Sequence, residues 1–155
     1  MPANTALGCS FGAVHRGYTL AELAVALAVM GLVTALALPR WGSWLDRIAV
    51  ERAASEITTA LAVTRNAAVL RATRARLSIA ADSLGIDELG GRSWVPVLRW
   101  PGPASHGVSL ETSNELVIFG ATGIGLGVSN TTVMLRRGTQ AAKITMSRVG
   151  RVKRW

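Results

Sequence analysis

The clearest pattern in the chain is a long apolar run near its start. Residues 20–38 are hydrophobic except for Glu22, Gly31 and Thr34. As a helix rising about 1.5 Å per residue, this run would be about 28 Å long, close to the ~30 Å hydrocarbon core of a bilayer. The pattern therefore predicts a membrane helix at 18–39, followed by a soluble domain at 40–155.

The helical period continues beyond Pro39 into the soluble part of the chain. Apolar residues recur at spacings that we expect to form one buried stripe: Trp44, Leu45, Ile48, Ile57, Leu61 and Ala68. Charged residues are expected to lie off this stripe: Arg47, Arg52, Glu56 and Arg65. The pattern predicts one helix from Tyr18 to about residue 72, with its second half packed on the domain.

After the helix, the pattern changes to short alternating segments separated by turn residues. The predicted strands are 76–80, 94–99, 115–119, 131–136, 142–146 and 151–155. Gly90-Gly91 and Pro101-Gly102-Pro103 mark breaks between them. The sequence thus predicts an α+β chain, a long N-terminal helix packed on a C-terminal antiparallel β-sheet domain.

A glycine-rich segment, Gly123-x-Gly125-x-Gly127, has the spacing of part of a nucleotide-binding fingerprint. That fingerprint follows a strand and opens a helix. Here residues 130–135 alternate like a strand, so we interpret the glycines as a hairpin loop.

Nothing in the chain indicates catalysis. His106 is the only histidine beyond residue 17, and Cys9 is the only cysteine, so no disulfide forms within one chain. We interpret Glu111 and Glu115 as a solvated acidic face. No apolar run precedes Cys9, which argues against a lipidation site there. We expect no enzyme activity, no cofactor and no metal site.

The charge is concentrated at the C-terminus. The net charge is +8, and seven basic residues and no acidic one lie between residue 136 and the end. A basic tail beside a mixed domain favours a polyanion partner, either nucleic acid or anionic lipid. The alternative interpretation is a soluble, arginine-rich protein whose charge has no specific partner.

The order of features at the N-terminus is the reverse of an ordinary signal peptide. In His15-Arg16-Gly17-Tyr18, the charge and the small residue come before the apolar run, so cleavage after Gly17 would leave the helix on the mature protein. The segment resembles the prepilin peptidase site of type IV pilins and type II secretion pseudopilins. That site has a glycine before the cut, an aromatic residue after it and a glutamate four residues further on. Gly17, Tyr18 and Glu22 fill these positions.

This resemblance implies a leader at 1–17, processing by prepilin peptidase and N-methylation of Tyr18. It also implies a single pass through the inner membrane, a periplasmic C-terminal domain and later incorporation into an envelope filament. The implied partners are other pilins or pseudopilins, the inner-membrane assembly platform and membrane lipid. The alternative is a simple signal-anchored periplasmic protein that tolerates one acid near the end of its helix.

Glu22 and Pro39 are the residues that the resemblance assigns to assembly. An ionised glutamate costs about 2.5–3.5 kcal/mol at the centre of a bilayer and less near its edge, so Glu22 favours a cationic partner. In filaments of the family, the implied partner is the free α-amine of a neighbouring subunit. Proline near this depth of the helix is common in pilins.

The C-terminal half resembles the GspH/FimT group of minor pilins and pseudopilins. Segments 61–68, 117–119, 132–135, 144–147 and 150–153 carry this resemblance. It implies the type IV pilin fold. Two functions compete within the group: a type II secretion pseudopilus tip subunit without DNA binding, and a type IV pilus subunit that binds DNA through a C-terminal Gly-Arg-x-Arg motif.

Residues 150–153 fit this motif except that Lys153 replaces the last arginine. In an extended tail, Arg151 and Lys153 would face one side, and Val152 and Arg154 the other. Our hypothesis is non-specific DNA binding through phosphate contacts. The candidate residues are Arg136, Arg137, Arg148, Arg151, Lys153 and Arg154, with Trp155 available to stack on a base.

Overall fold

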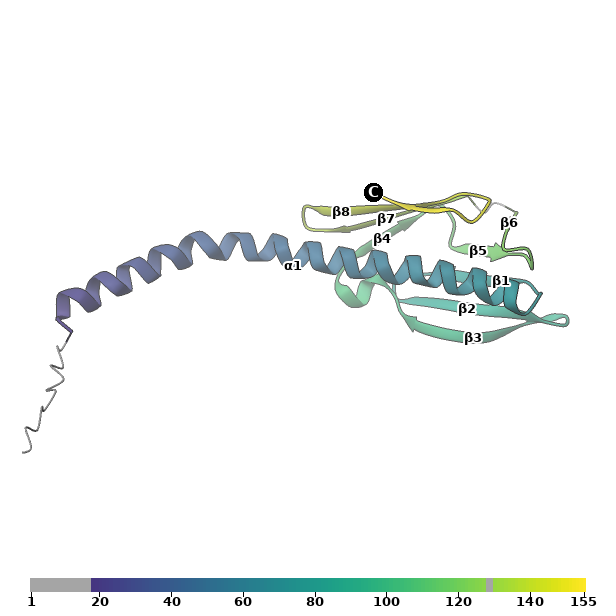
Figure 1. Cartoon of the computed structure of the whole chain (residues 1–155), viewed down its shortest axis with the longest axis horizontal. Coiled ribbons are helices and arrows are strands. Elements are labelled where there is room, and N and C mark those ends of the chain that lie inside the picture. Colours follow the sequence, from purple (N-terminus) through teal and green to yellow (C-terminus); the bar gives the residue numbers. More distant parts are fainter. Residues whose placement is uncertain (1–17, 128–129) are drawn as a thin grey trace, which may run out of the picture. The chain divides into compact units, whose positions relative to one another are not determined.

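The computed structural model describes residues 18–127 and 130–155 (Figure 1). A single long helix, α1 (Leu20–Leu70), precedes a series of short strands in these residues. The strands and one 3-10 helix follow in the order β1 (Ala75–Ile79), β2 (Ser83–Gly90), β3 (Ser93–Pro101), η1 (Pro103–His106), β4 (Ser109–Thr112), β5 (Leu116–Phe119), β6 (Gly125–Leu126), β7 (Thr131–Arg137), β8 (Gln140–Met146) and β9 (Val152–Arg154). The predicted α+β class is confirmed.

The chain divides into two compact units, Met1–Leu38 and Pro39–Trp155. Among the described residues, no single helix meets the conditions of length and hydropathy for a membrane span. Leu20–Leu36 and Trp41–Leu70 meet them only when they are taken together. The predicted leader at 1–17 lies outside the described residues.

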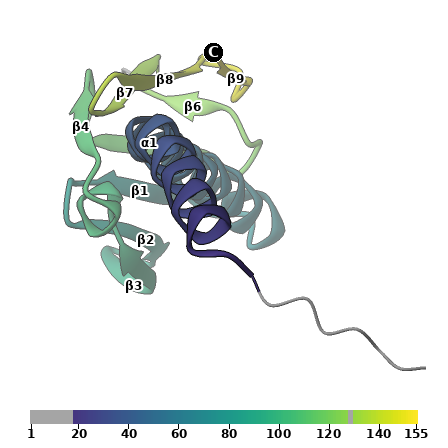
Figure 2. The ribbon, with the colours of Figure 1, turned by 90° about the vertical axis from the view of Figure 1, so that its left-hand side faces the viewer.

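The second unit contains two antiparallel sheets. One sheet has the strand order β3-β2-β1-β5-β6, and the other has the order β4-β7-β8-β9. In Figures 1 and 2, β1, β2 and β3 lie on one side of the C-terminal half of α1, and β7 and β8 lie on another side. The helix therefore packs against both sheets at once.

The buried face of α1 is built mainly from small side chains. It comprises Ala49, Val50, Ala53, Ala54, Ile57, Ala60, Leu61, Thr64 and Ala68, all less than 9% exposed. Alanine favours helix formation and lets neighbouring backbones approach closely. The sheets contribute the larger side chains of the same core, among them Leu77, Ile86, Phe119, Leu135 and Ile144.

The apolar stripe expected on α1 is wrong in its first half. Ile57, Leu61 and Ala68 are buried, but Trp44 and Leu45 are 62% and 53% exposed. The cause is the helical period. The step between residues 48 and 57 is about two and a half turns, so side chains at these positions point to opposite sides. The predicted stripe therefore joined two different faces.

Six predicted strands correspond to β1, β3, β5, β7, β8 and β9, and both predicted breaks lie at strand ends. Three strands, β2, β4 and β6, were not predicted. β2 contains two glycines and two acids, and residues 84–88 are all buried, so it shows no alternation of apolar and polar positions. The glycine-rich segment contains β6, which pairs with β5 through Ile118 and Leu126. The interpretation as a loop alone was therefore incomplete.

We predict that replacing a leucine of α1 by alanine lowers the free energy of unfolding much more at a buried position than at an exposed one. Leu61→Ala removes a side chain that is 2% exposed and is expected to lower the free energy of unfolding by about 2–5 kcal/mol. Leu45→Ala, at an exposed position of the same helix, is the matched control and is expected to cost about 0.5 kcal/mol or less. Urea denaturation of the detergent-solubilised chain, followed by circular dichroism, measures both. Equal costs would contradict the observed buried face.

Candidate functional site

The processing motif lies at the beginning of α1. Gly17 is outside the described residues, Tyr18 is 83% exposed, and α1 begins two residues later at Leu20. Pro39 lies within α1. The aromatic residue of the motif is thus placed in the short non-helical stretch directly before the helix.

Glu22 caps its own helix. Its Oε2 atom accepts hydrogen bonds from the Thr19 backbone N–H at 2.9 Å and from the Thr19 hydroxyl at 3.2 Å. The Thr19 hydroxyl oxygen in turn accepts the Glu22 backbone N–H at 3.2 Å. This is a capping box, which satisfies N–H groups that have no partner within the helix.

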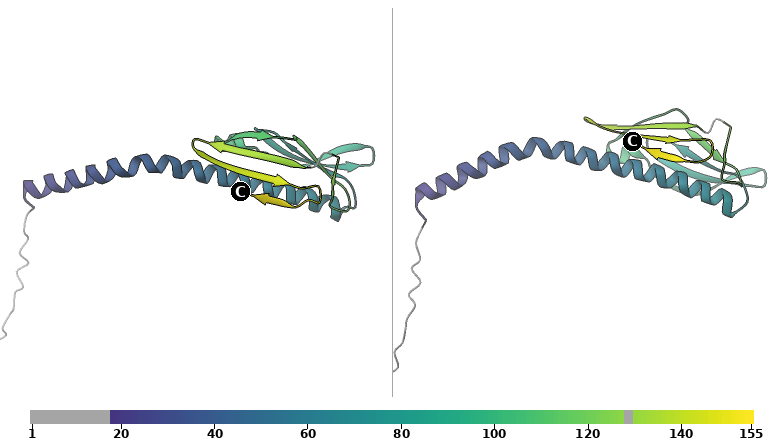
Figure 3. Two further views of the ribbon diagram at one scale, coloured as in Figure 1. Left: turned by 90° about the horizontal axis from the view of Figure 1, so that it is seen from above. Right: turned by 45° about the horizontal axis from the view of Figure 1, so that its top comes forward.

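The C-terminal strands β7, β8 and β9, which lie side by side in the views of Figure 3, place several cations on one face of their sheet. In β8, Ala142, Ile144 and Met146 are buried, so Lys143 and Thr145 lie on the outer face. Lys153 is the register partner of Thr145 and therefore lies on that face too. Val152 and Arg154 point to the opposite side, as the sequence predicted for an extended tail.

Further side chains extend this outer face. Arg136 on β7 is the register partner of Ala141 on β8, and both are exposed. Arg151 is two residues before Lys153 in the extended tail, so its side chain lies on the same face. Its carbonyl oxygen accepts a hydrogen bond from the Ser147 N–H at 2.9 Å. We call Arg136, Lys143, Arg151, Lys153 and Trp155 the basic face. None of its four cations has a carboxylate partner among the described residues.

Trp155 lies among these cations. Its backbone N–H and carbonyl both pair with Lys143, at 2.9 and 3.2 Å, so the two residues are opposite each other. The Lys153 ammonium lies 5.5 Å from the centre of the Trp155 ring, within the range of a cation–π contact. The ring is 72% exposed, so one aromatic surface is available beside two lysines.

Three predicted DNA-binding residues do not belong to this face: Arg154, Arg137 and Arg148. Arg154 forms an ion pair with Glu51 on α1. Arg137 donates to Asp46 at 2.8 Å and also to the carbonyl oxygen of His106. Both guanidinium groups therefore connect the sheet to neighbouring elements. Arg148 is exposed in the turn before β9, where its carbonyl accepts the Gly125 N–H at 2.9 Å.

Lys143 is the member of the basic face that the sequence analysis did not name as a candidate. It lies in a predicted strand between buried residues, and its alternation with Ala142 and Ile144 places it outward. That signal was available in the sequence. Its neighbours Lys153 and Trp155 follow only from the pairing of β8 with the tail.

Gly150 sets the direction of the chain into this face. It is buried and has φ +76°, a conformation that side chains with a Cβ rarely adopt. A Cβ atom there would lie 3.1 Å from the Gly123 carbonyl oxygen and 3.3 Å from Arg65 Nε. The glycine of the motif therefore lets the chain turn closely against a neighbouring loop and α1 before Arg151.

Most acids of the second unit are occupied by other cations. Asp87 accepts Arg76 at 2.7 Å and Arg99 at 3.3 Å, and Glu88 pairs with Arg71 at 2.8 Å. Glu111 and Glu115 are exposed, as expected. In the part of the chain that the structure describes, no cluster of three or more histidine, cysteine, aspartate or glutamate residues could hold a metal ion.

Two family models match this chain. A model described as type II transport protein GspH matches residues 53–150. A model of the prokaryotic N-terminal methylation motif matches residues 13–38. No curated protein sequence matches the chain.

Solved structures with a similar fold include a type IV minor pilin and a minor pseudopilin of a type II secretion system. The type IV minor pilin FimU of Pseudomonas aeruginosa has a TM-score of 0.60 at 18% identity, over 71% of this chain and 90% of FimU. The type II secretion minor pseudopilin EpsH of Vibrio cholerae has a TM-score of 0.56 at 11% identity, over 70% of this chain and 94% of EpsH. The predicted pilin fold is confirmed.

We predict that Gly150→Ala is more damaging than the same change at a glycine with a similar backbone. The positive φ alone is expected to cost about 1–2 kcal/mol of unfolding free energy, and the close Gly123 and Arg65 contacts add to this cost. Gly127, with φ +66° and open space around the position of a Cβ atom, is the matched control. Its replacement by alanine is expected to lower the free energy of unfolding only by the cost of the positive φ. Urea denaturation compares the two variants. An equal loss would show that the space around Gly150 is not restrictive.

Proposed function

Because the chain belongs to the family of the type II transport protein GspH, we propose that it acts as a minor pilin-like subunit of an envelope filament rather than as an enzyme. Prepilin peptidase would remove residues 1–17 by cleaving between Gly17 and Tyr18. The match to the methylation motif at residues 13–38 supports this step. The mature subunit would then be N-methylated at Tyr18.

Before assembly, the apolar run would hold the subunit in the inner membrane by a single pass. His15 and Arg16 precede this run, which favours a cytoplasmic leader and a periplasmic C-terminal domain. The Thr19–Glu22 capping box gives Glu22 a local partner and so reduces the cost of placing this acid near the membrane edge. In the filament, the α-amine of a neighbouring subunit would take the place of this partner.

We further propose that the basic face binds DNA non-specifically. The observation that carries this proposal is the placement of Arg136, Lys143, Arg151 and Lys153 on one sheet face without carboxylate partners among the described residues. Lysine and arginine neutralise phosphates and release counterions, which favours binding without regard to sequence. Trp155 offers a surface on which an unpaired base can stack.

A second function, that of a type II secretion pseudopilus subunit without DNA binding, is favoured by the description of the family and by the likeness to EpsH. In that case the basic face would contact an acidic partner protein or anionic lipid. The two functions share processing and assembly and differ only in what the basic face binds.

Cleavage at the proposed site gives a direct prediction. When the chain is expressed with a prepilin peptidase, Gly17→Val is expected to abolish processing, because a bulky side chain replaces the small residue before the cut. Tyr18→Phe keeps the aromatic ring and is the matched control, with processing as in the wild type. Intact-mass spectrometry measures loss of residues 1–17. Cleavage of Gly17→Val at this bond would contradict the proposed site.

DNA binding gives a prediction that separates the basic face from the ion-paired arginines. Lys143→Ala, Arg151→Ala and Lys153→Ala are each expected to weaken binding of the detergent-solubilised chain. Each is expected to flatten the log–log salt slope by about 0.7–0.9. Arg137→Ala, whose guanidinium pairs with Asp46, is the control and is expected to change the slope by much less. Fluorescence anisotropy with labelled duplex and single strands at several salt concentrations provides the measurement.

The outcome of this titration decides between the two functions. Absence of binding at low salt would overturn the DNA proposal and favour the pseudopilus function. Equal effects of Arg137→Ala and Lys153→Ala would show that binding follows total charge rather than the basic face.

A further inference from the structure

A group of apolar side chains on α1 remains exposed at the start of the second unit. Trp41, Trp44 and Leu45 are 66%, 62% and 53% exposed, and Ile48 is half-buried. Their spacing places them on one side of the helix. We call these four residues the tryptophan patch. None of the described strands covers it, although two tryptophans together expose a large apolar surface.

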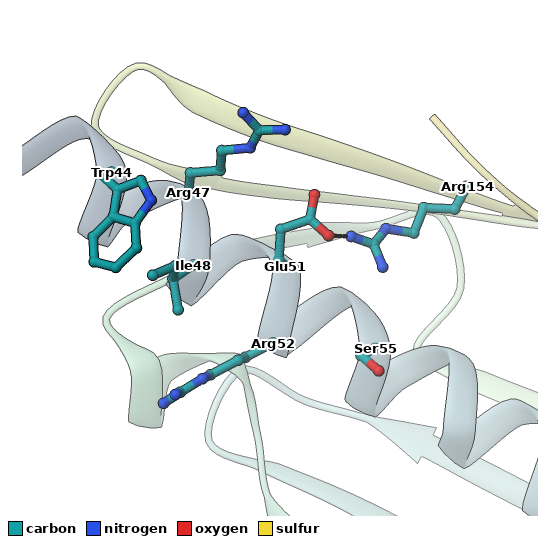
Figure 4. Close-up of a pocket in the computed structure, with 7 residues that line it drawn as sticks. All are labelled: Trp44, Arg47, Ile48, Glu51, Arg52, Ser55 and Arg154. Carbon is teal, nitrogen blue, oxygen red and sulfur yellow. Dashed lines mark ion pairs between the residues drawn. The ribbon is translucent and has the colours of Figure 1, made fainter.

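Arginines border this patch without acidic partners. Figure 4 shows Trp44, Ile48 and Arg52 following one another along one side of α1, next to Arg47 and Glu51. Glu51 is occupied by Arg154. Arg47 and Arg52 have no carboxylate partner among the described residues.

The second acid of this stretch is also engaged. Asp46 pairs with Arg137 at 2.8 Å, and a Cβ atom on Gly138 would lie only 2.4 Å from its Oδ2 atom, so the β7–β8 turn packs closely against it. The exposed charge beside the tryptophan patch is therefore positive.

We propose that the tryptophan patch, together with Arg47 and Arg52, anchors the unassembled subunit among anionic phospholipid headgroups at the membrane surface. This proposal rests on the membrane anchorage proposed above and extends it from the apolar run to the first turns of the second unit. The ligand is the surface of the bilayer, with tryptophan rings at the headgroup level and arginines on the phosphates.

The position of the patch along the chain supports a membrane surface as its partner. Trp41 is three residues beyond Leu38, the last residue of the apolar run, a separation that corresponds to a rise of about 4.5 Å in an ideal helix. The polar region on each side of a bilayer is roughly 5–8 Å thick. Side chains that begin at Trp41 would thus enter the region directly outside the hydrocarbon core.

The chemistry of the patch supports the same partner. Tryptophan is enriched at membrane–water interfaces, because its ring is apolar and its N–H needs a polar partner. Basic residues near an anionic leaflet gain about fivefold in affinity each. A second copy of the chain is the competing occupant, but the unpaired Arg47 and Arg52 on both copies would then repel each other across the contact.

Bromolipid quenching of tryptophan tests the proposal. The full chain is reconstituted at low density in vesicles of phosphatidylcholine and phosphatidylglycerol, with bromine atoms on the upper acyl carbons of the lipids. The double variant Trp41→Phe/Trp44→Phe is expected to lower the tryptophan emission that the bromolipids quench to about a third of the wild-type value or less, because these rings lie at the interface. Trp94→Phe, at a half-buried ring on β3 that contacts Arg76, is the control and is expected to leave the quenched part unchanged.

The arginines are tested in the same vesicles. The double variant Arg47→Gln/Arg52→Gln is expected to lower the affinity for anionic headgroups by about fivefold for each arginine. Tryptophan quenching should therefore depend less on the phosphatidylglycerol content of the vesicles. Arg92→Gln, at an exposed arginine of the β2–β3 turn, is the control and is expected to have no effect.

Flotation of the same vesicles at alkaline pH reports membrane insertion separately. Full flotation with unquenched Trp41 and Trp44 would overturn the surface anchor and leave the proposed membrane segment standing. Loss of flotation would overturn both. Cross-linking between copies through position 44 at low density, with no quenching, would identify a second copy as the occupant and overturn the proposal.

Discussion

The enclosure of one helix face between two sheets is the constraint on which the second unit depends. A helix that meets sheets on two sides has little room for large side chains, and its buried face accordingly contains Ala53, Ala54 and Ala60, all at 0% exposure. The sheets supply the volume instead. β9 follows from this arrangement: it is only three residues long, and it is held by pairing with β8, by partial burial of Val152 and by the Arg154–Glu51 ion pair.

The same packing decides where the charge is exposed. α1 and β2 carry acids that accept the arginines nearest to them, such as Arg137 and Arg99. Cations on the outer face of β7, β8 and the tail have no such partner among the described residues. Four of the seven cations between residue 136 and the end thus form one basic face, and a second, smaller cationic region remains beside the tryptophan patch.

Local patterns predicted much of the fold. The α+β class, the extent of α1 and six strands follow from periodicity, because most of these elements bury one face and leave the other in water. β3 is an exception, with no fully buried residue. β2 was missed because both of its faces are buried. Its acids are paired: Asp87 with arginines of the neighbouring strands β1 and β3, and Glu88 with Arg71 directly after α1. The apolar stripe was misplaced because Trp44 and Ile48 share a helix face that the sheets do not cover.

The sequence by itself determined the processing motif, the apolar run and the alternation of the tail, since each depends on residues that are close together in the chain. Only the tertiary structure decided which cations are available. Arg137 is 91 residues from Asp46, and Lys143 meets Trp155 only through strand pairing. The strength of an ion pair depends on distance in space, which a linear pattern does not contain. For this reason the tail motif was visible in the sequence, whereas the basic face and the exposed tryptophan patch were not.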